Sequence, residues 1–64
     1  MLKFYNRNEM IIWVIDNYFY GYMWKFSELI NLNDIRLAKE IKKISKNSVQ
    51  MKKENNIYIL EYLF

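Results

Sequence analysis

Residues 18–26, YFYGYMWKF, place an aromatic side chain at every second position. Because side chains alternate between the two faces of a β-strand, a strand here would carry all of these rings on one face. The rings belong to Tyr18, Tyr20, Tyr22, Trp24 and Phe26. Upstream, residues 10–15 (MIIWVI) form an unbroken apolar run. Together the two stretches hold more apolar surface than a chain of 64 residues easily hides from water, which points to a binding partner.

The stretches at 10–15 and 18–26 are predicted to be strands, because Trp, Tyr, Phe, Ile and Val favour sheets. The Asp-Asn pair between them tolerates the backbone of a tight hairpin turn. A helix over residues 9–26, opened by Asn8, is the alternative, but it would be apolar on every side, and a small domain cannot easily surround such a helix. Residues 2–5 are predicted to form a third strand.

The clearest predicted helix begins after Asn33, a favourable N-cap, and ends near Asn47, which tolerates a left-handed backbone. Asp34 suits the positive end of the helix dipole. One stripe of this helix carries the apolar side chains of Leu37, Ile41 and Ile44. Nearly opposite lie the basic side chains of Arg36, Lys39, Lys43 and Lys46. The helix is therefore amphipathic with a basic outer face, on which Ile35 is an apolar exception expected to pack at the first turn.

A second hairpin is predicted after this helix. Residues 48–52 alternate polar and apolar side chains, residues 53–56 offer turn chemistry, and residues 57–64 again resemble a strand. The expected fold is therefore α+β, with a mostly antiparallel sheet in the order β-β-β-α-β-β and one amphipathic helix on one face. The chain has no linker or repeat, so we expect a single domain over residues 1–64.

One helix of about a dozen residues can cover only one face of such a sheet. The other face is expected to present a partner-binding surface made of Tyr18, Tyr20, Tyr22 and Trp24. Tyr and Trp are typical anchors of protein interfaces, which favours a protein partner or a homodimer formed through the sheet. Stacking of nucleic-acid bases on the rings is the alternative, but Lys25 is the single cation within this stretch.

Basic residues gather in the second half of the chain. The first 32 residues carry equal numbers of cations and carboxylates, whereas residues 36–53 carry seven cations against Glu40 alone, a net charge of +6. The basic helix face is therefore a candidate site for phosphates or for an acidic protein surface. An ordinary solvated face is the alternative, because the abundance of Asn, Lys, Ile and Tyr is typical of an AT-rich genome.

The chain contains neither His nor Cys, so it lacks the commonest general base, the thiolate nucleophile and the usual ligands of zinc. It also has no glycine-rich phosphate loop and no metal-ligand motif. A Ser-Lys dyad through Ser45 or Ser48 is conceivable, but both serines are better explained as helix-cap and strand-edge residues. We therefore expect no catalysis, no cofactor and no metal.

The longest apolar run, six residues, is far too short to span a membrane, and the N-terminus lacks the pattern of a signal peptide. The lack of Cys is compatible with a reducing compartment. We expect an intracellular, cytoplasmic protein with no membrane partner.

Residues 37–41 (LAKEI) and 44–49 (ISKNSV) resemble the helix-turn-helix family, in which an Ala precedes the turn and the recognition helix begins at a Ser. The resemblance implies a mainly α, winged fold in which residues 50–63 form a short wing. It also implies which side chains would face the DNA major groove, namely those of Lys46, Asn47 and Gln50.

Two function classes are therefore expected. The first is a small non-enzymatic protein that docks an aromatic sheet face and a basic helix onto a larger macromolecule. The compact, AT-biased composition is similar to that of phage or mobile-element inhibitors of host machinery, including anti-CRISPR-type proteins. The alternative is a small helix-turn-helix regulator that binds DNA. The first class predicts a protein partner, and the second predicts nucleic acid.

Overall fold

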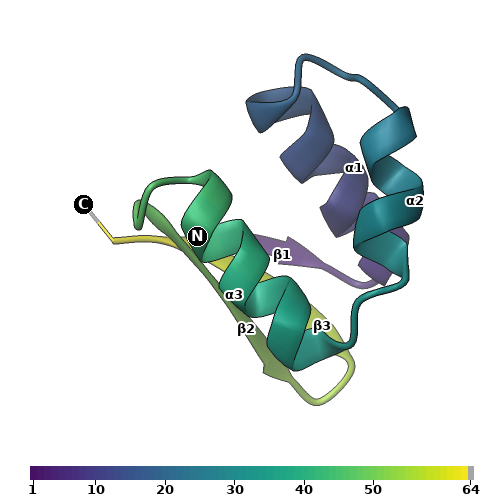
Figure 1. The fold of residues 1–64 in the computed structure, drawn as a ribbon. Helices are drawn as coiled ribbons and strands as arrows, with labels where there is room; N and C mark the ends of the chain where they lie inside the picture. Colours follow the sequence, from purple (N-terminus) through teal and green to yellow (C-terminus); the bar gives the residue numbers. More distant parts are fainter. Residues whose placement is uncertain (64) are drawn as a thin grey trace.

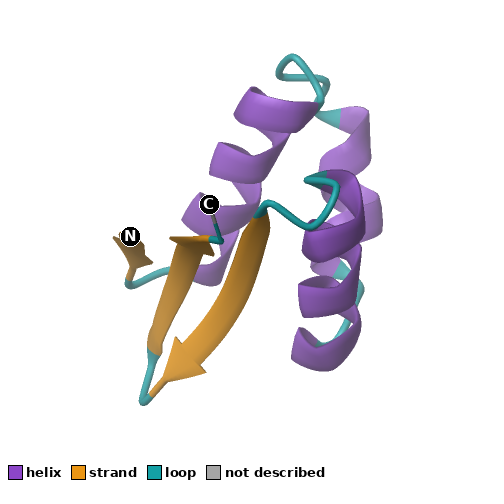
Figure 2. Ribbon diagram, turned by 90° about the vertical axis from the view of Figure 1, so that its left-hand side faces the viewer, coloured by secondary structure: helices purple, strands orange, loops and turns teal. Residues whose placement is uncertain are grey.

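The computed structural model describes residues 1–63, whose elements follow the order β1 (Leu2–Phe4), α1 (Arg7–Tyr18), α2 (Trp24–Ile30), α3 (Asp34–Ile44), β2 (Val49–Glu54) and β3 (Ile57–Tyr62). The strands form one antiparallel sheet in the order β1-β3-β2, in which Leu60 of β3 lies opposite Leu2 on one side and Met51 on the other. The helices lie on one side of this sheet (Figure 1, Figure 2). The expected α+β class is confirmed, but the order of the elements differs from the predicted one.

The strands predicted at 10–15 and 18–26 are wrong. The first stretch lies within α1, and the second is divided among the end of α1, a connecting loop and the start of α2. The signal for α1 is Asn6, whose side-chain oxygen accepts hydrogen bonds from the backbone N–H groups of Asn8 (2.8 Å) and Glu9 (3.4 Å). This cap satisfies donors that a helix start leaves free. The regular aromatic spacing therefore runs across three elements and lines no sheet face.

An apolar α1 is possible because only one side of it is buried, while its polar residues Asn8, Glu9, Asp16 and Asn17 stay exposed. Its fully buried side chains join one core with side chains from α2, α3 and the sheet; they are Met10, Ile11, Val14 and Ile15. Aromatic packing extends this buried side, since the ring of Trp13 lies 6.4 Å from that of Phe4 in β1 and 6.3 Å from that of Tyr18. The helix was rejected from the sequence as apolar on every side, but its polar residues share one side with Ile12, and that side faces solvent.

The loop after α1 turns through a left-handed backbone at Tyr20 (φ 55°) and Gly21 (φ 76°). The N–H of Gly21 donates to the carbonyl of Ile15 at 3.1 Å, which closes the end of α1. Glycine adopts this conformation without strain, whereas a bulky residue such as Tyr20 adopts it rarely. The loop leads into α2, whose Leu29 enters the core.

The helix predicted after Asn33 is confirmed as α3. The side chain of Asn33 accepts a hydrogen bond from the N–H of Arg36 at 2.9 Å. Beyond the other end, Asn47 adopts the expected left-handed backbone (φ 65°) and donates to the carbonyl of Lys42 at 2.8 Å. The inner stripe is also confirmed, with Leu37 and Ile41 fully buried and Ile44 half-buried.

The second predicted hairpin is confirmed as β2 and β3, joined at Asn55 and Asn56. From the register, Val49 and Met51 lie on the face that packs against the helices. The opposite face carries the polar side chains of Lys3, Gln50, Lys52, Glu54 and Glu61, together with the apolar side chains of Ile57 and Ile59. Within residues 1–63 the sheet thus lacks the exposed aromatic face on which a homodimer through the sheet was predicted.

Candidate functional site

The outer face of α3 carries a row of exposed cations: Arg36, Lys39, Lys42 and Lys43, continued by Lys46 just beyond the helix. We call these five residues the basic face. Sequence reasoning identified four of them, and all four are exposed as expected; Lys42 is the addition. Because Leu37 and Ile41 hold the opposite side of α3 in the core, the basic face is fixed toward solvent.

Ion pairing separates the basic face from the other cations of residues 1–63 except Lys3, which has no ion pair either. Four ion pairs occur within residues 1–63: Arg7–Asp34, Lys25–Glu28, Lys52–Glu61 and Lys53–Asp34. In this part of the chain, none of the five basic-face side chains takes part in one. No carboxylate of residues 1–63 lies within ion-pair distance of these five side chains, so their positive charge can act on an anionic partner.

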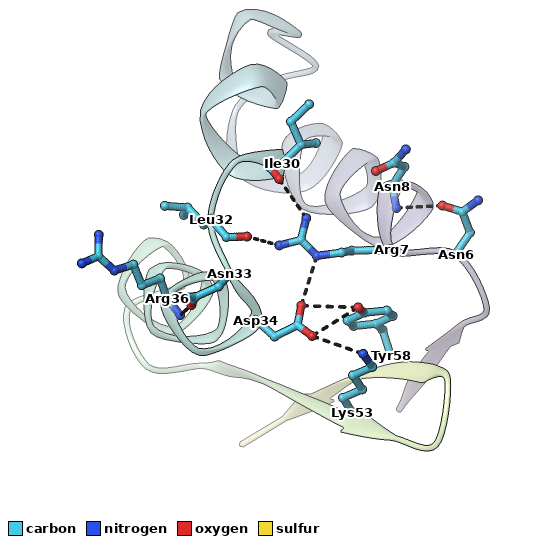
Figure 3. A network of polar contacts seen from close by, with 10 residues as sticks. All are labelled: Asn6, Arg7, Asn8, Ile30, Leu32, Asn33, Asp34, Arg36, Lys53 and Tyr58. Atoms are coloured by element: carbon cyan, nitrogen blue, oxygen red, sulfur yellow. Dashed lines mark hydrogen bonds and ion pairs between the residues drawn. The ribbon is translucent and has the colours of Figure 1, made fainter.

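Arg7, the first residue of α1, anchors the start of α3 (Figure 3). Its Nε donates to Oδ1 of Asp34 at 3.1 Å, its Nη1 to the carbonyl of Ile30 at 3.1 Å, and its Nη2 to the carbonyl of Leu32. Ile30 ends α2, and Leu32 lies in the connection to α3. A single guanidinium therefore fixes both the turn between the two helices and the helix that follows it.

Asp34 also joins α3 to the hairpin (Figure 3). Its carboxylate accepts hydrogen bonds from Nζ of Lys53 (3.3 Å) and from the hydroxyl of Tyr58 (3.3 Å). Partial burial opposes ionisation of Asp34, but the hydrogen bonds and charges of Arg7 and Lys53 outweigh it and lower the pKa of the carboxyl below its ordinary value. The ionised carboxylate thus holds the turn end of the hairpin beside the first turn of α3.

Ile35 lies on the outer face of α3 next to this anchor. It was expected to pack at the first turn, and that prediction is wrong, because 71% of the residue is exposed. The neighbouring side chains explain the difference, since Asp34 binds Arg7 and Lys53, and Leu37 enters the core, so neither covers Ile35. An exposed isoleucine thus lies among the cations of the basic face.

The end of the hairpin is an exposed polar segment made of Lys53, Glu54, Asn55 and Asn56. Asn55 has a left-handed backbone (φ 57°), which suits a two-residue turn. Since Lys53 contacts the start of α3, this segment and the basic face lie on adjoining parts of the molecule.

Three of the five exposed aromatic residues within residues 1–63 gather elsewhere, in residues 20–24, which we call the aromatic corner; the other two are Tyr5 and Tyr62. Tyr20 is 90% exposed, Trp24 63% and Tyr22 58%. Tyr18, the fourth residue predicted for the aromatic surface, is instead half-buried against Trp13. The corner lies at the end of the molecule remote from the hairpin turn (Figure 1, Figure 2). The aromatic corner and the basic face are therefore separate surfaces. The aromatic corner lies in the loop after α1 and at the first residue of α2, not on a sheet face.

The cation beside the aromatic corner is already engaged. Nζ of Lys25 lies 2.7 Å from Oε2 of Glu28, and it sits over the rings of Phe19 (5.1 Å) and Trp24 (5.8 Å). This arrangement makes Lys25 a poor partner for a phosphate, because its charge is shared with groups of the protein itself.

The recognition helix that the helix-turn-helix resemblance implies is not formed by the residues predicted for it. Gln50 lies in β2, so no recognition helix runs through it, and Lys46 and Asn47 belong to the turn after α3. Ser45 caps the end of α3, and its Oγ accepts a hydrogen bond from the N–H of Val49 at 3.0 Å. The two helices joined by a short turn are α2 and α3, separated by residues 31–33 and followed by the hairpin.

Comparison with models of known protein families, with curated proteins and with solved structures finds no match to this chain. In residues 1–63 no helix combines the length and apolar character needed to cross a bilayer. The same residues contain no cluster of acidic side chains that could hold a metal ion.

Proposed function

We propose that this protein is a small DNA-binding regulator of the helix-turn-helix kind, in which α2 and α3 form the two-helix unit and the hairpin β2–β3 forms a wing. The observation that carries the proposal is the basic face, whose cations are exposed and unpaired among residues 1–63 and lie on the second helix of the unit. In such domains the second helix enters the major groove.

The dimensions of α3 fit this role. An α-helix with its side chains is about 10–12 Å wide, and the major groove of B-DNA is about 12 Å wide. With Leu37 and Ile41 buried, the side of α3 that faces outward is the cationic one. Lys and Arg side chains on this side would contact phosphates along the groove edges, which fixes the position of the helix on the duplex.

The anchor at the start of α3 supports the same function. A free carboxylate at Asp34 would repel a phosphate approaching the first turn, but Arg7 and Lys53 both bind it. Their contacts also fix α3 relative to the hairpin. A preorganised surface of this kind loses little conformational freedom on binding.

The hairpin end would contact the backbone next to the groove. Asn55 and Asn56 are exposed and offer side-chain amide donors of the kind that bind phosphate oxygens. We assign no catalytic step to either surface, and we place this activity inside the cell, where the DNA is.

The proposal is tested by fluorescence anisotropy of the full chain with a labelled duplex of random sequence at several salt concentrations. For about four phosphate contacts, a plot of log affinity against log salt should have a slope of about −3 to −4. Lys39→Gln should weaken binding and reduce the steepness of the slope by about 1. Lys3→Gln, on the outer face of the sheet, makes the same change in net charge and should have no such effect.

A second function is proposed for the aromatic corner, namely docking of a protein partner. Tyr20 and Trp24 are exposed, and Lys25 is already paired with Glu28 and lies over the Trp24 ring. Exposed rings without an unpaired cation beside them favour a protein surface over a nucleic-acid backbone as the partner. The compositional similarity to phage and mobile-element inhibitors, anti-CRISPR-type proteins included, makes host machinery the partner class to test.

Affinity capture from a bacterial lysate treated with nuclease tests this second function. A stoichiometric protein partner retained by the wild type and lost by the double variant Tyr20→Ala, Trp24→Ala would support it. Loss with Lys39→Gln and retention by the double variant would assign the partner to the basic face instead.

A further inference from the structure

Ile35 differs from the other apolar residues of α3. Leu37 and Ile41 are fully buried and Ile44 is half-buried, whereas 71% of Ile35 is exposed. Isoleucine is among the residues most often buried in proteins, although single exposed apolar residues are common. The exposure of Ile35 is informative because Ile35 lies among the cations of the basic face.

The helix period places Ile35 at the centre of the outer face. Side chains three, four and seven positions along a helix share one side, and for Ile35 these belong to Ala38, Lys39 and Lys42. Lys39 and Lys42 are exposed and Ala38 is half-buried. The short apolar side chains of Ile35 and Ala38 would let the helix come close to the floor of a groove. The long side chains of Lys39 and Lys42 would then extend their ammonium groups toward the phosphates at the groove edges.

Ile35 is the second residue of α3. In a helix-turn-helix unit, the N-terminal residues of the second helix contact the edges of the bases. An isoleucine side chain has no hydrogen-bond donor or acceptor, so it can recognise only an apolar group there. The C5-methyl of thymine is the apolar group that the major groove displays.

We propose that Ile35 is a specificity-determining residue that packs against the C5-methyl group of a thymine in the major groove. The inference rests on the proposed DNA-binding function and deepens it, since it names the ligand as duplex DNA with a thymine at one fixed position of the site. Ala38, on the same stripe, borders the contact.

Uracil provides the probe, because it keeps the O4 acceptor and the base pairing of thymine and lacks only the methyl group. Duplexes that bind the full chain are first selected from a random library, and each thymine of the best duplex is then replaced by uracil, one at a time. At one position the wild type should bind about fourfold more weakly, the change expected for losing about one buried methyl group.

The Ile35→Ala variant should bind the thymine and uracil duplexes equally at that position, whereas Ile35→Val should keep most of the difference. Ile12→Ala, at an exposed residue of α1, is the matched control and should discriminate like the wild type. Circular dichroism confirms that each variant is folded.

The outcomes separate the inference from the function on which it rests. If duplexes are selected but no position responds to uracil, or if Ile35→Ala still responds, Ile35 does not read a methyl group, and DNA binding stands. If no duplex is retained by the wild type, both the proposed function and the role of Ile35 are overturned.

Discussion

Arg7 and Asp34, 27 positions apart in the sequence, join the first residues of α1 and α3 through an Nε–Oδ1 contact of 3.1 Å. The same guanidinium binds two carbonyls at the end of α2 and in the following turn. Three helices thus meet at a single cation. The orientation of the basic face depends on this contact, because α3 begins there.

Replacing Arg7 with Ala should lower the free energy of unfolding by about 2 kcal/mol, because the carboxylate and two carbonyls lose a charged donor. Arg7→Lys should fall between wild type and Ala, since an ammonium cannot span all three acceptors. Urea unfolding measures both. Lys3→Ala should change stability by less than about 0.5 kcal/mol. Equal stability of wild type and Arg7→Ala would refute the role of this anchor.

Asp34 should make stability depend on pH in the acid range. Its pKa in the folded protein lies below the ordinary value, so the ionised carboxylate stabilises the fold above that ordinary value, and the contribution is lost as the pH falls through the folded pKa. At neutral pH, Asp34→Asn should be less stable by at most about 1 kcal/mol, because the side chain is 36% exposed.

Thermal unfolding of the wild type and of Asp34→Asn, followed from neutral pH down to about pH 2, tests this. The two stability curves should converge below about pH 4, the range in which aspartate protonates. Parallel curves over the whole range would show that the Asp34 carboxylate is not a stabilising group.

Ile12 and Val14 test the helical assignment of the first apolar run. In a strand the two side chains would share a face, but in α1 Val14 is fully buried and Ile12 is 38% exposed. Val14→Ala should therefore destabilise by about 1.5–3 kcal/mol and Ile12→Ala by less than about 1 kcal/mol. Equal losses in urea unfolding would favour the strand.

Tyr20 carries a backbone conformation that suits asparagine better than tyrosine (φ 55°). Since Tyr20 is 90% exposed, its ring contributes little to the core. Tyr20→Asn should thus raise the free energy of unfolding by about 0.5–1 kcal/mol while removing a ring from the aromatic corner. Tyr22→Asn, at a position without a left-handed backbone, should not stabilise. A less stable Tyr20→Asn protein would show that the ring has a structural role.

The second half of the fold was predictable because its signals are local. Asn33 is followed by an apolar stripe of helical period, and Ser48 to Lys52 alternate with the period of a strand. Each signal is decided within a few residues, so α3 and the hairpin could be identified, as could the exposed cations of the basic face.

The first half was not predicted from its apolar pattern, because the dense apolar residues of α1 hid the polar side formed by Asn8, Glu9, Asp16 and Asn17. One local signal was overlooked: Asn6 followed three residues later by Glu9 is typical of a helix start. The aromatic spacing over residues 18–26 is typical of a strand, but Tyr20 and Gly21 adopt left-handed backbones, which interrupt any extended strand there. The Arg7–Asp34–Lys53 contacts depend on tertiary packing and leave no pattern in the sequence.

DNA binding by the outer face of α3 can be observed residue by residue. The most direct measurement is a heteronuclear NMR titration of the full chain with a duplex selected for binding. If α3 enters the major groove, the backbone signals of Ile35, Lys39 and Lys42, together with those of the hairpin end, should shift in proportion to bound DNA, while the signals of residues 20–24 should stay in place. Shifts confined to residues 20–24, or none at stoichiometric duplex, would contradict DNA binding by this face.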